Sequence, residues 1–246
     1  MFSYQVLIEY DGTNFVGWQK QKNGISVQET IEKVLKKILK EKILLYGSGR
    51  TDSGVHAIEQ SAHFSSIHNI KDRIKFLNSI NFFLRKKNIS ILDIKKKNQK
   101  FHSRYSAKKR IYKYVIINRH APLTLNLNRA WHIKNVLDVN LMKKASKLLI
   151  GTKDFTMFRS SSCGANSPIK TIEFIKIRKE QEKIIFLFKS KSFLQQQVRS
   201  MVGCLKFIGE KKWSLNKFKK FINLKKRSNC APPAPSAGLY LYKVMY

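Results

Sequence analysis

The chain has 246 residues, enough to bury a hydrophobic core in one large domain or two smaller ones. Its 49 Lys and Arg residues against 15 Asp and Glu residues give a formal charge of +34, which favours a polyanionic partner, with nucleic acid first. AT-rich coding accounts for part of this excess, since Lys, Ile and Asn are all abundant. No signal-like N-terminus and no apolar run of membrane-spanning length is present, so we expect a cytoplasmic protein with no membrane partner.

The three cysteines, Cys163, Cys204 and Cys230, lie far apart in the sequence and form no Cys-x-x-Cys pair. This spacing argues against a disulfide framework and against a structural zinc site. We expect reduced and mostly buried thiols, and no resident metal.

The first part of the chain opens with an alternating segment, residues 2–10, that predicts a strand with one wetter face. Ser26 followed by Glu29 forms a capping box, and apolar residues at helical spacing then predict a helix to about Glu41. The pattern continues with a short strand into a glycine-rich loop, a strand near 57–65, a helix near 71–84 and a strand near 89–94.

A similar order returns later in the chain. The sequence predicts a strand at 109–118, a helix capped by Asp138 that stops at Gly151, strands at 171–178 and 183–189, a helix at 193–209, another capped by Ser214, and a closing strand at 238–246. We therefore predict an α+β protein with two pseudo-symmetric halves, residues 1–105 and 106–246. The repeat lies in the order of the elements, because the two halves show no clear sequence similarity.

Residues 47–57, which read Gly-Ser-Gly-Arg-Thr-Asp-Ser-Gly-Val-His-Ala, are the strongest candidate for a functional loop. They place one carboxylate, Asp52, beside Arg50 and among small residues, directly after an apolar run. The glycines allow a tight turn and close approach of another molecule to the backbone. A carboxylate in such a cationic setting is ionised at neutral pH.

Three other interpretations of this loop are weaker. A phosphate-binding P-loop needs Gly-Lys-Ser/Thr, which is missing. A glycosidase needs a second carboxylate, and the candidate, Asp11, stands in a sequence that equally indicates a turn. Asp52 could also simply cap backbone amides, but Arg50 and the basic context favour a site.

The loop and four further segments together resemble the TruA-type tRNA pseudouridine synthases. Residues 49–57 match the family's pattern around its catalytic aspartate at every fixed position. The other matching segments are residues 10–19, 101–107 and 110–114, and a set spread over the second half at 154–159, 193–203 and 234–241. The resemblance covers the chain from end to end.

The resemblance implies that uridine in tRNA is isomerised to pseudouridine, at positions 38, 39 and 40 of the anticodon stem-loop. It further implies a continuous mixed, mainly antiparallel sheet flanked by helices, a cleft between the two halves, a homodimer, and no cofactor. Moving a glycosidic bond without hydrolysis needs one carboxylate and a sealed pocket for the detached base. A single aspartate is therefore sufficient.

The resemblance also assigns roles to individual residues. Asp52 is the catalytic nucleophile or base, and Arg199 forms an ion pair with it. Tyr112 is expected to stack on the flipped uracil, and Leu239 to close the pocket. Arg50 is a candidate to fill the gap that the flipped base leaves. Periodicity alone would make Tyr112 and Leu239 core residues and Arg199 a solvated charge.

Other polar residues near the motifs are given simpler roles. His56 and His102 are predicted to be structural hydrogen-bonding groups. Basic side chains beside the motifs are candidates to track tRNA phosphates: Lys20, Lys22, Lys108, Lys109 and Arg110. Two alternatives stay open, a non-catalytic RNA-binding or chaperone protein of the same fold, and the same chemistry at another RNA site.

Overall fold

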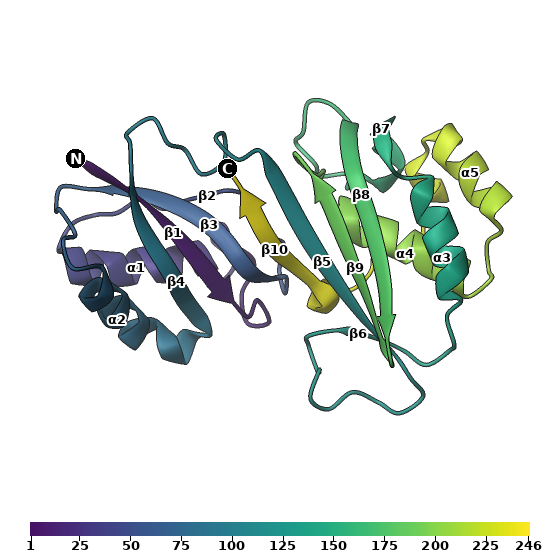
Figure 1. The fold of residues 1–246 in the computed structure, drawn as a ribbon, viewed down its shortest axis with the longest axis horizontal. Coiled ribbons are helices and arrows are strands. Elements are labelled where there is room, and N and C mark those ends of the chain that lie inside the picture. The colour runs from purple at the N-terminus through teal and green to yellow at the C-terminus, as the bar shows by residue number, and fades with distance from the viewer. The chain divides into compact units, whose positions relative to one another are not determined.

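The computed structural model describes residues 1–246 and divides them into two compact units. The first unit comprises residues 1–108 together with 240–246, and the second comprises 109–239 (Figure 1). The final segment thus clusters with the first unit, whereas its position in the sequence places it in the second half. No helix is both long enough and apolar enough to cross a membrane.

The sheet of the first unit is built on β1 (Phe2–Tyr10), which pairs antiparallel with both β3 (His56–Ser66) and β4 (Ile89–Lys97). Two further strands join β3, namely the antiparallel β2 (Tyr46–Gly47) and the parallel β10 (Leu239–Met245). The strand predicted at 2–10 is confirmed. Its wetter face is confirmed at the end of the strand, where Leu7 is half-buried and Glu9 exposed, whereas Ser3 and Gln5 are buried and Gln5 donates its amide to Ser61.

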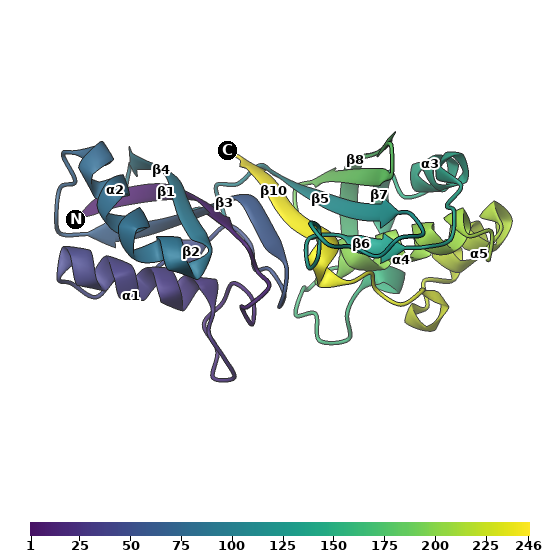
Figure 2. The same ribbon diagram turned by 90° about the horizontal axis from the view of Figure 1, so that it is seen from below.

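Two helices cover one face of this sheet, α1 (Val27–Leu39) and α2 (Arg73–Leu84) (Figure 2). The predicted cap of α1 is confirmed, since the Ser26 hydroxyl accepts from the Glu29 amide at 3.2 Å. The Glu29 carboxylate does not complete the box, because it lies 3.0 Å from Lys33 one turn along the helix. The helix buries Val27, Ile31, Leu35 and Leu39 on its sheet side.

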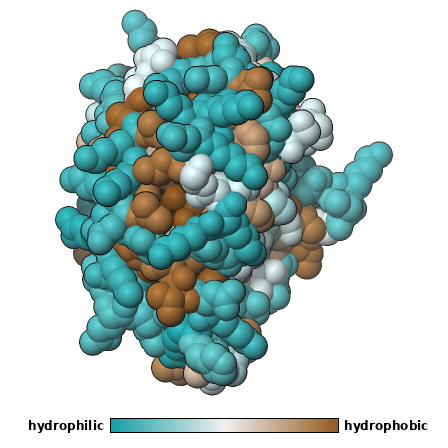
Figure 3. Space-filling view, turned by 90° about the vertical axis from the view of Figure 1, so that its right-hand side faces the viewer, coloured by the Kyte–Doolittle hydropathy of each residue, from teal (hydrophilic) through white to brown (hydrophobic).

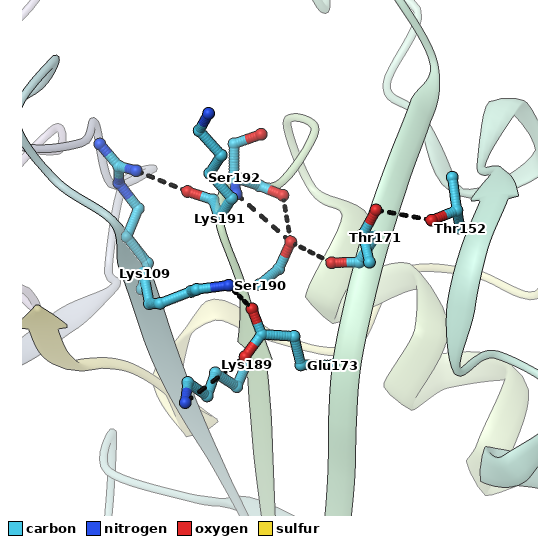
Figure 4. Close-up of polar contacts among 9 residues, drawn as sticks. Lys109, Thr152, Thr171, Glu173, Lys189, Ser190, Lys191 and Ser192 are labelled. Carbon is cyan, nitrogen blue, oxygen red and sulfur yellow. Dashed lines mark hydrogen bonds and ion pairs between the residues drawn. The ribbon is translucent and has the colours of Figure 1, made fainter.

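The second unit has four antiparallel strands in the order β5 (Lys109–Asn118), β9 (Lys183–Ser190), β8 (Ile169–Glu180) and β7 (Gly151–Asp154). A short β6 (Trp131–Ile133) pairs parallel with β5. Side-chain contacts also run across the sheet. Lys109 and Lys189 both point to Glu173, and the Thr152 and Thr171 hydroxyls lie 2.8 Å apart (Figure 4).

Three helices belong to the second unit: α3 (Val139–Lys147), α4 (Gln197–Gly209) and α5 (Leu215–Leu224). Asp138 and Ser214 cap α3 and α5 as predicted. The helix predicted from 193 begins only at Gln197, because Gln196 is left-handed with φ 60° and the Gln197 side chain accepts from the Leu194 amide. Short 3-10 turns occupy Arg85–Lys87, Thr156–Phe158, Arg227–Asn229 and Ser236–Gly238.

The predicted fold class is confirmed in both units. Each consists of a mainly antiparallel sheet with helices packed on it, and the parallel pairs β3–β10 and β5–β6 make the pairing mixed. Strands β6 and β7 were not predicted. The first unit follows the expected order of strand, helix, strand, strand, helix, strand.

Helix α4 packs against the proline-rich segment 231–235 at Gly203. A Cβ atom at this position would lie 2.1 Å from the carbonyl oxygen of Pro232, a backbone atom that cannot move independently. The same segment also forms a backbone hydrogen bond with the helix, since the Ala234 amide donates to the Arg199 carbonyl at 3.0 Å. The absence of a side chain at Gly203 therefore sets how closely the helix approaches this segment.

We expect Gly203→Ala to lower the free energy of unfolding by roughly 1–3 kcal/mol through overpacking. Helix propensity acts in the opposite direction, because Ala is the better helix former by about 1 kcal/mol. Denaturant unfolding measures the difference. Gly164→Ala is the matched control, since nothing lies within 4 Å of its Cβ position. A stabilised Gly203→Ala protein would contradict the close packing of α4.

Candidate active site

The glycine-rich loop lies between β2 and β3 and carries Asp52 at its centre. Asp52 is half-buried, and its carbonyl accepts from the Val55 amide at 3.2 Å, which closes a tight turn. Gly54 in this turn has φ 74°, a left-handed conformation that side chains rarely adopt. The loop therefore has one compact backbone shape that presents the carboxylate between two buried residues, Thr51 and Val55.

Residues 10–18, which we call the cradle segment, pack directly against the loop backbone. A Cβ atom at Gly12 would lie 2.1 Å from the Val55 carbonyl oxygen, and one at Gly17 would lie 2.6 Å from that of Thr51. The Trp18 amide donates to the Thr51 carbonyl at 3.1 Å. The two chain segments are thus in backbone-to-backbone contact on both sides of Asp52.

Side chains add further bonds to the loop. The Tyr10 hydroxyl and the Thr51 hydroxyl lie 2.8 Å apart in a buried setting, next to the aspartate in the sequence. At the other end, Ser48 donates to Gln60 at 2.7 Å, and Gln60 in turn donates to the Gly49 carbonyl at 2.8 Å. β1 therefore holds the centre of the loop beside Asp52, and β3 holds its start.

His56 is a buried hydrogen-bonding group, as predicted. Its Nδ1 atom lies 3.0 Å from the Gly12 amide and 3.2 Å from a carboxylate oxygen of Asp11, and its ring stacks on Tyr240 at 4.8 Å. Asp11 itself accepts from the amide and the hydroxyl of Thr13, at 3.0 and 2.5 Å. Asp11 thus forms the turn that the sequence indicated. The contacts of His56 with Gly12 and Asp11 fix the cradle segment to the start of β3.

In the second unit, Tyr112 and Tyr114 lie on the same side of β5 but in different surroundings. Tyr112 is half-buried and meets Phe193 edge-on at 5.2 Å, whereas Tyr114 is fully buried and donates to the Pro235 carbonyl at 2.8 Å. Burial raises the pKa of the Tyr114 hydroxyl, and the Arg199 charge opposes that rise. Tyr114 is thus the core residue, and Tyr112 is the more accessible of the two.

Arg199 is fixed on α4 by its own side chain. Its Nε donates to the Ala234 carbonyl at 2.7 Å, opposite the backbone bond between the same two residues. Leu239 follows five residues later at the start of β10 and is 6% exposed. The segment that anchors Arg199 thus leads directly to Leu239. In the first unit, Arg50 is exposed on the loop that holds Asp52.

Two of the residues predicted to track phosphates are engaged within the protein. Arg110 is 9% exposed and donates to the Lys191 carbonyl at 2.6 Å, and Lys109 pairs with Glu173 (Figure 4). Lys22 and Lys108 are exposed. Arg110 thus has an acceptor within the second unit, and its contact with a tRNA phosphate stays a prediction.

Cations also cover surfaces remote from the motifs in the sequence. The face of the second unit that carries α3 and α5 is mostly hydrophilic, with a strip of hydrophobic side chains through it (Figure 3). The exposed basic residues of α3 and α5 are Lys143, Lys144, Lys147, Lys217, Lys219 and Lys220. The charge of the chain is therefore not concentrated at the candidate site.

Sequence analysis assigned no role to Tyr10, Gly12, Gly17 or Gln60. The only sequence signal for these residues was that segment 10–19, which includes Tyr10, Gly12 and Gly17, matches a family motif. Its physical function, contact with a loop about 40 residues away, depends on the pairing of β1 with β3.

Comparison with known proteins identifies the family. The profile of the tRNA pseudouridine synthase family matches residues 6–106 and 145–246. A curated "tRNA pseudouridine synthase A" from Pelagibacter ubique is 59% identical over 246 residues and covers both chains completely. Proteins of the same name from Maricaulis maris (41% identical, 99% of this chain and 97% of the relative) and Neorickettsia sennetsu (42%, 99% and 99%) are also similar.

A solved structure titled "Crystal Structure of a Cbf5-Nop10-Gar1 Complex" matches 82% of this chain and 44% of its own chain, at 10% sequence identity and a TM-score of 0.36. A likeness this weak carries no argument about the protein. The sequence matches are decisive without it. A family profile that matches most of the chain and a full-length relative at 59% identity define an RNA-modifying isomerase, and the chain belongs to the tRNA pseudouridine synthase family. It isomerises uridine in tRNA.

We expect the Tyr10 and Thr51 hydroxyls to stabilise the loop as a coupled pair. Tyr10→Phe leaves the buried Thr51 hydroxyl without this partner and lowers the free energy of unfolding by roughly 1–3 kcal/mol. Thr51→Val does the same. The double variant loses less than the sum of the two, with a coupling of about 0.5–3 kcal/mol in a double-mutant cycle.

Tyr242→Phe is the control for this cycle, because Tyr242 is exposed on β10. We expect it to change the free energy of unfolding by less than about 0.5 kcal/mol. Strictly additive effects of Tyr10→Phe and Thr51→Val would show that the two hydroxyls do not depend on each other.

Proposed function

We propose that this protein converts uridine to pseudouridine at positions 38, 39 and 40 of the tRNA anticodon stem-loop, with Asp52 as the catalytic nucleophile or base. The observation that carries the proposal is the loop of Asp52. Its backbone is fixed on both sides by the cradle segment, and the loop sequence matches the family pattern at every fixed position.

The reaction places limited demands on the protein. The bond from N1 of uracil to C1′ of the ribose breaks, a bond from C5 to C1′ forms, C5 loses its proton, and N1 gains one. No atoms are gained or lost overall. A positioned carboxylate can attack the sugar or the base and can take the proton, so Asp52 alone suffices for either route.

A fixed loop favours such a reaction because the carboxylate does not need to be ordered when the substrate binds. The turn at Asp52 is closed by backbone bonds, and the neighbouring Thr51 side chain is held by Tyr10. Effective molarities for groups held in reacting geometry are large, and misplacement by about 1 Å is costly. The rigid backbone on either side of Asp52 supports its assignment as the reacting group.

The remaining roles are proposed from the family resemblance together with the local setting of each residue. Arg199, anchored to Ala234 through Nε, forms an ion pair with Asp52. Tyr112, half-buried on β5, stacks on the flipped uracil, and Leu239 closes the pocket around it. Arg50, exposed beside Asp52, occupies the gap left in the stem.

The quaternary and cellular setting is also proposed by resemblance. We propose a cytoplasmic homodimer in which one tRNA reaches both subunits. Sedimentation at micromolar concentration measures the dimer directly.

We expect Asp52→Asn to abolish pseudouridine formation while leaving tRNA binding nearly unchanged, because Asn keeps the size of the side chain and loses the nucleophile. The substrate is an unmodified tRNA with uridine at 38, 39 and 40. Since isomerisation leaves the mass unchanged, the product is mapped by chemical modification and primer extension at each position.

Asp72→Asn is a matched control in the same unit. Asp72 caps α2 through the Lys75 amide at 2.8 Å, and Asn caps a helix equally well, so this variant keeps its stability and activity. Full activity in Asp52→Asn would refute its role. A wild-type protein that binds tRNA tightly but forms product elsewhere would refute the assignment to positions 38 to 40.

A further inference from the structure

A row of aromatic rings lies on the surface of the first unit. It consists of Tyr46, His102 and Tyr105 over the buried His63, and we call it the aromatic row. The ring centroids of His102 and Tyr105 are 4.4 Å apart, those of His63 and His102 are 4.6 Å apart, and those of Tyr46 and His63 are 5.2 Å apart.

The exposure of these rings is unusual in this chain. Among its Phe, Trp and Tyr side chains only four are exposed, and two of the four belong to the row, Tyr105 at 77% and Tyr46 at 47%. The other two, Phe82 and Tyr242, stand on different elements. Large aromatic rings are normally buried, so two exposed ones that both contact the His102 ring indicate a surface that another molecule covers.

Hydrogen bonds hold the row in place beneath its exposed face. The Ser103 hydroxyl donates to the Tyr46 carbonyl at 2.5 Å, and the Ser103 amide donates to Nδ1 of His63 at 3.2 Å. The Arg104 amide donates to Nδ1 of His102 at 3.1 Å. Both Nδ1 atoms therefore act as acceptors. Burial lowers the pKa of His63 and the nearby His102 lowers it further, against a hydrogen bond with the Tyr46 backbone that raises it, so the net shift favours the uncharged ring.

The charge around the row suits an RNA strand. Within the first unit, residues 95–108 contain six Lys and Arg residues and no Asp or Glu. The Arg104 guanidinium lies 5.7 Å from the Tyr105 ring, and Lys97 lies 5.3 Å from the ring of Phe101. Proteins bind unpaired nucleotides through aromatic rings that stack on bases and cations that contact the adjacent phosphates.

The row is also close to the loop of Asp52 along the chain. Tyr46 directly precedes the loop, in β2, and pairs with His63 on β3. His56, at the loop end of β3, is seven residues from His63, or at most about 23 Å along an extended strand. A tRNA bound at the loop extends well beyond this distance.

We propose that the aromatic row is a stacking site for an unpaired base of the tRNA, separate from the pocket for the reacting uridine, with Arg104 contacting a neighbouring phosphate. The proposal rests on tRNA being the substrate. It assigns a function to residues 101–107, a motif that sequence analysis recognised without finding a role for it.

The test compares tRNA affinity among single variants by fluorescence anisotropy over a range of salt concentrations. Tyr105→Leu keeps an apolar side chain and removes the ring, so it weakens binding roughly 5- to 100-fold. Tyr105→Phe keeps the ring and binds within about twofold of wild type. Because Tyr105 is 77% exposed, neither change threatens folding.

Salt dependence separates stacking from charge. Tyr105→Leu leaves the slope of log affinity against log salt unchanged, whereas Arg104→Gln reduces the slope by about one. Phe82→Leu is the matched control, since Phe82 is an exposed ring with Arg85 4.5 Å from it, and it binds tRNA normally.

Wild-type affinity in Tyr105→Leu would overturn the proposal. Equal weakening of tRNA binding by Tyr105→Phe or by Phe82→Leu would also overturn it. A change in the sedimentation of Tyr105→Leu with unchanged affinity per protomer would overturn it as well, since the row would then be a contact between copies of the chain. Product mapping on the wild-type protein is read separately. If it shows product elsewhere while the affinities behave as expected, the assignment to positions 38, 39 and 40 fails and the stacking site stands.

Discussion

The structure of the candidate site depends on one constraint, the backbone contact between the cradle segment and the loop of Asp52. Two glycines make it possible. Any side chain at Gly12 would collide with the Val55 carbonyl, and any at Gly17 with that of Thr51. These carbonyls flank Asp52 on both sides, so the contact fixes the backbone conformation from which the carboxylate projects.

The surrounding interactions maintain this contact. His56 joins the cradle segment to β3, Tyr10 joins β1 to Thr51, and Gln60 holds the start of the loop. Most of these bonds link residues that are far apart in sequence and adjacent across the β1–β3 pairing. Loss of one bond would cost a modest free energy, but all of them act on the same short turn. We therefore regard the sheet of the first unit as the support for the aspartate.

Local signals in the sequence predicted much of the fold. The caps at Ser26, Asp138 and Ser214 and the alternation of β1 and β5 correspond to elements in the structure, because caps and periodicity are properties of neighbouring residues. Short strands such as β6 and β7 were missed. Three or four residues carry too little pattern, and they become strands only through their partners β5 and β8.

The same distinction between what local sequence predicts and what needs tertiary contacts applies to the candidate site. Sequence motifs identified Asp52 and its proposed partners. They did not reveal the function of Gly12 and Gly17, because a glycine has no side chain whose chemistry would indicate a role. Nor did they predict the burial of Arg110, whose acceptor is the carbonyl of a residue about 80 positions away. Chemistry-bearing residues can be recognised from type and spacing, whereas supporting contacts require the tertiary structure.

The account's central claim is that the loop is rigid before tRNA binds. Amide hydrogen exchange on the free protein tests it most directly, at the amides of Gly12, Trp18, Gly54 and Val55, which all donate hydrogen bonds between or within the two segments. We predict protection close to that of the paired amides of β1 and β3. Rapid exchange at these four amides while the strands stay protected would show that the loop is mobile and would contradict the account.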